Sequence, residues 1–95
     1  MREWAFITAW NPGSRRLALE ANEARQAELV GIIRERGWRH FEGSGIPARG
    51  DWQAEASVLV LGISQGEAAD LGRRFGQNAI VTGRCGGAAV LVYCG

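Results

Sequence analysis

Apolar runs alternate with polar, Ala-rich stretches along this chain, and their order predicts its secondary structure. The run AFITAW, residues 5–10, is compact and rich in residues that favour β-strands. Asn11 and Pro12 end this strand, because proline lacks the N–H that a β-ladder uses and restricts the residue before it. Gly13 continues the turn, and Ser14 stands where it would cap a short first helical turn.

A long helix is predicted over residues 18–36, where Ala, Glu, Arg and Leu dominate. Gly37 ends it, because glycine is the usual residue just past a helix C-terminus. The apolar stripe on its C-terminal half consists of Leu29, Val30, Ile32 and Ile33.

Two strands separated by a loop follow the long helix. Residues 38–43 (WRHFEG) predict the first strand, and residues 43–51 predict the loop by their Gly, Ser and Pro content. The run SVLVLGI, residues 57–63, is apolar on both faces, which predicts a central position in a sheet.

A shorter helix follows this central strand. Ser64 and Glu67 in SQGE have the spacing of a capping box, in which each residue's side chain bonds to the other's backbone N–H. The helix runs to about residue 75, and Gly76 stops it. The residues spaced to face the sheet are Ala68, Leu71 and Phe75.

The remaining residues predict a β-hairpin and complete the topology. Residues 79–84 and 88–94 are strands joined by a tight turn at residues 85–87. The order β-α-β-β-α-β-β predicts an α+β protein with a ferredoxin-like sheet, two helices on one face and an added C-terminal edge strand. Residues 1–95 are expected to form a single small domain.

Composition narrows the classes of protein that fit. The net charge is +1, which favours neither nucleic acid nor a membrane surface as partner. No apolar run has the roughly 18 residues of a membrane helix. Cys85 and Cys94 flank the last predicted strand, too far apart for a disulfide, so we expect free thiols. Free thiols fit a reducing compartment, so we expect a cytoplasmic protein. With one His and no CxxC, we expect no metal site, and we expect no cofactor.

The buried stripe of the long helix turns polar at its N-terminal end. Steps of three and four back from its apolar positions reach Gln26, Arg25 and Asn22. Two interpretations are open. Either Asn22 caps a helix that begins later and Arg25 lies on a solvated flank, or these side chains line a pocket together with Asn11 and Ser14.

Two other segments carry residues that fit such a pocket. Trp52 and Glu55 precede the strand at 57–63, and Gln77 precedes the strand at 79–84. Each has a structural alternative. Trp52 would cover the core, Glu55 would form a weak surface ion pair, and Gln77 would bridge backbone groups.

The order and spacing of these residues resemble a small bacterial family of unknown function, DUF3293. The segments that carry the resemblance are AFITAWNP with Ser14, Asn22 with Arg25, Trp52 with Glu55 and Ser57, and FGQNAIV. The resemblance implies that these positions form one recurring set, and it implies no activity. It is weakest in the loop at 43–51.

Three functions are therefore open. The first is a binding module for a small polar or anionic ligand or a protein partner. Its ligand-binding residues would be Asn11, Ser14, Asn22, Arg25, Trp52, Glu55 and Gln77. The second is an enzyme on a small substrate, with Glu55 as acid or base and Arg25 as electrostatic stabiliser. The third is a structural or interaction domain that pairs through its last strand. The oligomeric state and the identity of any catalytic residue stay open.

Overall fold

The computed structural model describes residues 2–45 and 55–94. Within those residues the elements follow the order β-α-β-β-α-β-β, with one short 3₁₀ helix (η1) after the first strand. Their bounds are β1 Glu3–Ile7, η1 Pro12–Ser14, α1 Leu19–Glu35, β2 Arg39–Gly45, β3 Glu55–Leu61, α2 Gln65–Arg74, β4 Ala79–Arg84 and β5 Val90–Tyr93. None of the helices in the described residues is long and apolar enough to cross a membrane.

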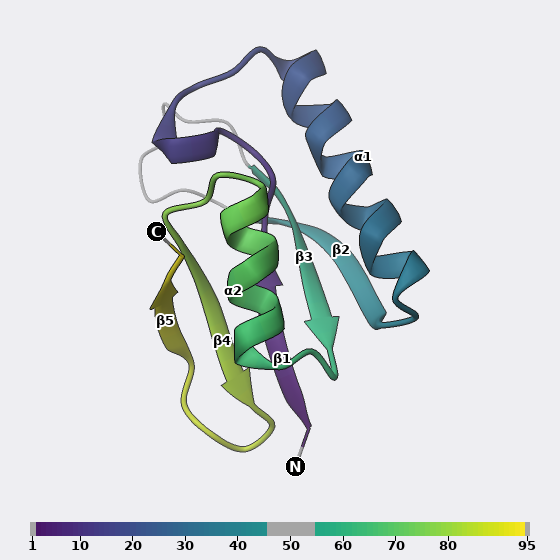
Figure 1. Cartoon of the computed structure of the whole chain (residues 1–95), viewed down its shortest axis with the longest axis vertical. Coiled ribbons are helices and arrows are strands. Elements are labelled where there is room, and N and C mark those ends of the chain that lie inside the picture. The colour runs from purple at the N-terminus through teal and green to yellow at the C-terminus, as the bar shows by residue number, and fades with distance from the viewer. Residues whose placement is uncertain (1, 46–54, 95) are drawn as a thin grey trace.

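The strands form one antiparallel sheet in the order β2-β3-β1-β4-β5. β1 lies at its centre, where Trp4 pairs with Leu61 of β3 on one side and with Gly83 of β4 on the other. Both helices cover the same face, α1 over β2 and β3, and α2 over β1 and β4 (Figure 1). This is the predicted ferredoxin-like α+β fold, with β5 added beyond β4.

The first strand differs from its predicted range of residues 5–10. β1 begins at Glu3 and ends at Ile7. It ends early because the backbone beyond Ile7 bonds to side chains instead of a neighbouring strand. The Ala9 N–H donates to Gln26, and the Trp10 N–H donates to the hydroxyl of Thr8.

Three other boundaries also shift. The start of the predicted loop at 43–51 belongs to β2, where Gly43 pairs with Ser57. β3 ends at Leu61 because Gly62 takes a positive φ of 80°. β5 begins at Val90, two residues later than predicted, so the connection from β4 is longer than a tight hairpin turn.

The core lies between the sheet and the two helices. Its strand residues include Ala5, Ile7, Val58, Val60 and Ile80, and its helix residues include Leu29, Ile33, Ala68, Leu71 and Phe75. These helix positions match the two predicted stripes. The predicted capping box of α2 is also confirmed, with reciprocal bonds of 3.1 Å between Ser64 and Glu67.

Candidate functional site

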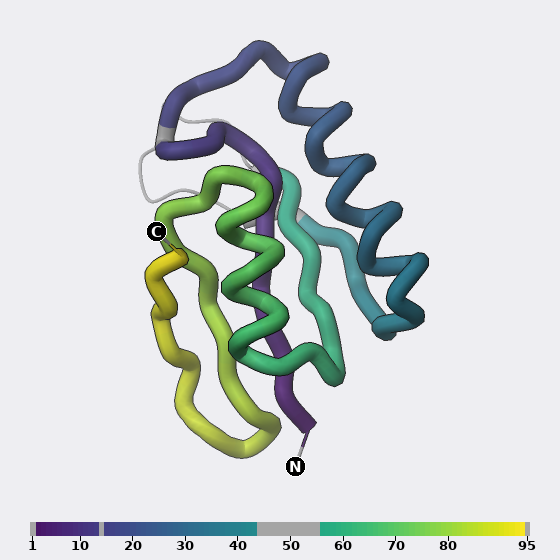
Figure 2. Tube along the Cα trace, viewed as in Figure 1, coloured from purple at the N-terminus to yellow at the C-terminus, as the bar shows by residue number. Residues whose placement is uncertain are grey.

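The segment between β1 and α1 crosses the C-terminal end of α2 before it reaches α1 (Figure 2). The Gly13 N–H donates to the carbonyl of Gly76 at 2.6 Å, which ties this crossing to the end of α2. The approach is so close that a Cβ on Gly76 would lie 2.8 Å from Pro12 Cβ. Asn11 starts the crossing at a φ of 46°, a left-handed conformation that asparagine tolerates better than most residues. It occupies the cap position of η1, so Ser14 ends that turn and the prediction that Ser14 caps it was wrong.

Asn22 joins α1 to this segment. α1 begins at Leu19, one turn earlier than a helix capped by Asn22 would, so the interpretation of Asn22 as a cap was wrong. The side chain is buried, with 2% exposed. Its Oδ1 accepts from the Asn11 N–H at 2.9 Å, and its Nδ2 donates to Asn11 Oδ1 at 2.9 Å and to the Leu17 carbonyl at 3.4 Å.

Gln26 and Arg25 hold Ala9, just beyond the end of β1. Gln26 Oε1 accepts from the Ala9 N–H at 3.0 Å, and Arg25 Nε donates to the Ala9 carbonyl at 2.8 Å. Arg25 Nη2 also donates to the carbonyl of Phe75, and its guanidinium lies 5.8 Å from the centre of that ring. Arg25 is half-buried and bonded to two segments, so it does not lie on a solvated flank.

Gln77, in the connection between α2 and β4, completes the network. Its Nε2 donates to the Trp10 carbonyl at 2.9 Å and to the Phe75 carbonyl at 3.4 Å. Gln77 therefore bridges backbone groups, the structural alternative that the sequence left open.

The indole of Trp10 is the feature of this region that sequence reasoning left undecided. The residue is buried, with 8% exposed, and its Nε1 has no hydrogen-bond partner among the residues that the structure describes. A buried donor without an acceptor costs roughly 1–3 kcal/mol, so this N–H stands out among the buried polar groups of the described residues. No local motif in the sequence marks this indole, because its burial depends on the packing of the fold.

The structure thus gathers four of the seven predicted site residues, Asn11, Asn22, Arg25 and Gln77, around one segment. Trp52 lies outside the described residues, and so do the side chains of Ser14 and Glu55. Among the described residues, no three His, Cys, Asp or Glu side chains are placed to hold a metal ion.

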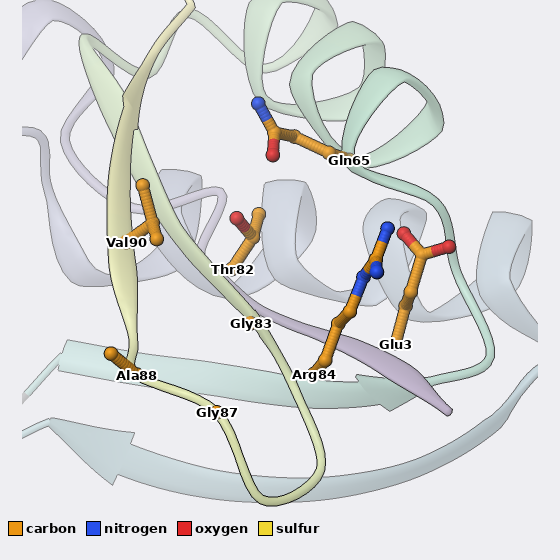
Figure 3. A pocket seen from close by; sticks show the side chains of 8 residues that line it. All are labelled: Glu3, Gln65, Thr82, Gly83, Arg84, Gly87, Ala88 and Val90. Atoms are coloured by element: carbon orange, nitrogen blue, oxygen red, sulfur yellow. The ribbon is translucent and has the colours of Figure 1, made fainter. Parts of the chain in front are cut away.

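A separate pocket of about 440 Å³ lies at the opposite end of β1, which sequence reasoning missed (Figure 3). Its lining residues are Glu3, Gln65, Thr82, Gly83, Arg84, Gly87, Ala88 and Val90. They come from β1, α2, β4, β5 and the β4–β5 connection. The pairing of Glu3 with Arg84 across two strands could not be read from the sequence before the register was known.

The observed elements form a ferredoxin-like α+β fold, and side chains of the polar network hold its β1–α1 connection in place. The chain belongs to the family described as proteins of unknown function, DUF3293, whose family model matches residues 7–80. The matched range includes the polar network and, of the pocket in Figure 3, only Gln65. No curated protein sequence matches the chain.

One solved structure of similar fold is a phage SAM lyase in complex with S-methyl-5′-thioadenosine. The two chains are 13% identical, the TM-score is 0.50, and the match covers 97% of this chain and 88% of the lyase chain. At this identity the likeness concerns the fold alone.

Proposed function

We propose that this protein is a binding module for a small polar or anionic ligand, held at the junction of the β1–α1 connection with the end of α2. The proposed site comprises Asn11, Ser14, Asn22, Arg25, Trp52, Glu55 and Gln77, with Trp10 as an addition. The observation that carries the proposal is the buried Trp10 Nε1, a donor for which no acceptor is found in residues 2–45 and 55–94.

The surrounding contacts suit a rigid site. Asn22 and Gln26 of α1, together with Gln77 just past the end of α2, bond to the backbone of residues 9–11, so the backbone that carries the Trp10 ring is held before any ligand arrives. A preformed site loses less conformational entropy on binding than one that must be ordered. Arg25 supplies a positive charge beside the same backbone, which favours a ligand whose acceptor is a carboxylate or phosphate oxygen.

A thermal-shift screen followed by calorimetry tests this proposal. The panel holds nucleotides, phosphorylated metabolites and dicarboxylates, together with S-methyl-5′-thioadenosine because the phage lyase of similar fold was solved with it. A ligand at about a hundred times its dissociation constant adds about 2.7 kcal/mol to the free energy of unfolding. Each compound that shifts the melting temperature is then titrated against wild type, Trp10→Phe and Trp38→Phe.

Trp10→Phe keeps an aromatic ring and removes the N–H. Trp38→Phe makes the same change at a half-buried tryptophan that lies just past the C-terminus of α1. We expect Trp10→Phe to weaken binding roughly fivefold or more, the value of one hydrogen bond, and Trp38→Phe to leave it unchanged. If no compound binds, or if Trp10→Phe binds as tightly as wild type does, the proposal fails.

A second candidate function is self-association through the last strand, with a second copy of this chain as partner. β5 lies at the edge of the sheet, and Val90, Leu91 and Tyr93 are 50%, 56% and 76% exposed. Leu91 also lies at one end of a row of paired apolar residues on the sheet face opposite the helices. The other members of this row are Val81, Phe6, Leu59 and Phe41. Contacts between protein chains often bury exposed apolar patches and pair the free edges of strands.

Sedimentation velocity over a hundredfold range of protein concentration tests this second candidate. Pairing through β5 predicts a dimer that Leu91→Glu disrupts, while Glu28→Gln on the exposed face of α1 leaves it intact. A monomer at every concentration excludes it.

A further inference from the structure

We propose that the pocket between the start of α2 and the β4–β5 connection binds a free α-amino acid. It is distinct from the site proposed above, because the two lie at opposite ends of β1. The pocket volume of about 440 Å³ falls within the usual range for small-molecule sites.

Two opposite charges stand side by side at this pocket. Glu3 and Arg84 are direct cross-strand partners on β1 and β4, so their side chains leave the same face of the sheet (Figure 3). Among the described residues, neither side chain forms an ion pair. A carboxylate and a guanidinium held as neighbours offer one partner for an ammonium group and one for a carboxylate.

The pocket is lined mostly by apolar surface, with a smaller polar share. Thr82 is 4% exposed and lines the pocket, and no hydrogen bond of its hydroxyl is found within the described residues. The Gln65 amide points toward the space above Thr82 and Val90 (Figure 3). Ala88 and Val90 supply apolar wall. An apolar side chain of modest size on the bound amino acid would contact this wall. A polar side chain on the bound amino acid could form hydrogen bonds with Thr82 and Gln65.

The charge arrangement selects for a zwitterion. A ligand with only a carboxylate would be attracted by Arg84 and repelled by Glu3. A ligand with only an ammonium would be attracted by Glu3 and repelled by Arg84. A direct Glu3–Arg84 ion pair at this exposed position would be worth little, so a ligand that engages both charges displaces little interaction energy.

NMR titration of the isotopically labelled full chain tests the proposal. The probes are leucine and glutamine, and two truncated relatives of leucine, namely 4-methylpentanoate, which lacks the ammonium, and isopentylamine, which lacks the carboxylate. We expect an amino acid to shift backbone resonances of residues 82–90, with each truncated relative binding roughly tenfold or more weakly.

Charge-removing variants identify the partners. Arg84→Gln and Glu3→Gln should each weaken amino-acid binding roughly tenfold or more, since each removes one charged hydrogen bond. Their matched controls are Arg2→Gln and Glu20→Gln, which change the net charge equally at exposed positions that do not line the pocket. Isopentylamine should lose little further affinity in Arg84→Gln, because it lacks the group that Arg84 holds.

Two results would overturn the proposal. The first is that no amino acid shifts residues 82–90 at millimolar concentration. The second is that the control variants weaken binding as much as the pocket variants do, which would show a general charge effect. The variant Trp10→Phe should bind amino acids as wild type does, so failure of this proposal and failure of the first are distinguishable.

Discussion

Asn11 and Asn22 form a reciprocal pair, in which each donates one hydrogen bond to the other at 2.9 Å. Asn11 is the one non-glycine residue with a positive φ among those the structure describes, and Asn22 is the buried residue of α1 that meets it. The pair joins the chain reversal after β1 to the first turn of α1. It therefore sets the path of the segment on which the proposed ligand site is built.

Replacing Asn22 tests this link. Asn22→Ala removes the Oδ1 that accepts from the half-buried Asn11 N–H and the Nδ2 that donates to the Leu17 carbonyl, so we expect a loss of about 2–3 kcal/mol in the free energy of unfolding. Urea unfolding measures it, with the slope m unchanged. The neighbour Glu23 is exposed, and Glu23→Ala should change stability by less than about 0.5 kcal/mol. Equal effects of the two variants would contradict a structural role for the pair.

Gly72 permits the close packing of α2 on β4 and the end of the chain. A Cβ at this position would lie 2.6 Å from Cys94 Sγ and 2.8 Å from Ile80 Cγ2. We expect Gly72→Ala to destabilise the protein by about 1–3 kcal/mol through overpacking, measured by thermal unfolding. Combining it with Cys94→Ala should recover part of the loss, because one of the two clashing atoms is removed.

Gly31 is the matched control for this change. It lies in the interior of α1, and a Cβ there would have no atom within 4 Å. Gly31→Ala should therefore stabilise the protein by up to about 1 kcal/mol through helix propensity. Stabilisation by both substitutions would show that α2 moves away from β4 without cost.

The two cysteines should differ in reactivity. Cys85 is exposed and Cys94 is buried, and burial raises the pKa of the Cys94 thiol although Arg73 acts in the opposite direction. Because the thiolate is the reactive form, we expect Cys85 to react with a thiol reagent on the order of tenfold or more faster in the folded protein. Pulse labelling with peptide mass spectrometry measures both rates. In urea the two rates should converge, and similar rates in the folded protein would refute the prediction.

The capping box of α2 should make stability depend on pH. The pKa of Glu67 is lowered, first by the Ser64 backbone N–H that donates to its carboxylate and then by the Ser64 side chain. A lowered folded-state pKa means that this contribution is present above the unfolded value of about 4.3 and is lost as pH falls through the folded value. Urea unfolding at neutral and acidic pH should show a smaller acid-induced loss for Glu67→Gln than for wild type.

Ser64→Ala provides the companion measurement. It removes the acceptor for the Glu67 N–H and should cost about 1 kcal/mol at neutral pH. Ser64→Asp keeps a capping oxygen and should retain most of the stability. If Glu67→Gln loses as much stability in acid as wild type does, other carboxylates account for the acid sensitivity.

The local elements of this protein were predictable because their signals lie within a few residues. SQGE opens α2 because Ser64 and Glu67 satisfy each other's backbone N–H groups, and that exchange needs no distant partner. Gly37 and Gly76 adopt positive φ values just past the two helices, as their residue type indicates. The polar end of α1 was also visible, since Asn22 and Gln26 interrupt an apolar period.

The end of β1 was not predictable from its own residues. Thr8, Ala9 and Trp10 look like a continuing strand, yet their backbone bonds go to Thr8 itself, Gln26, Arg25 and Gln77. Three of those side chains come from other parts of the fold. Whether this backbone bonds to a neighbouring strand or to side chains is therefore decided only when α1 and α2 pack against the sheet.

The sequence by itself therefore determined the element order, the helix ends and the ferredoxin-like α+β class, because backbone propensity, capping and hydrophobic period act over short separations. The tertiary structure decided which polar groups meet. It turned Asn22 from a candidate cap into the partner of Asn11, and it buried Trp10 Nε1 where no described residue accepts its proton. It also set Glu3 opposite Arg84 through a strand register that joins residues 81 positions apart. Such contacts depend on the packing of whole elements, which no short stretch of the chain specifies.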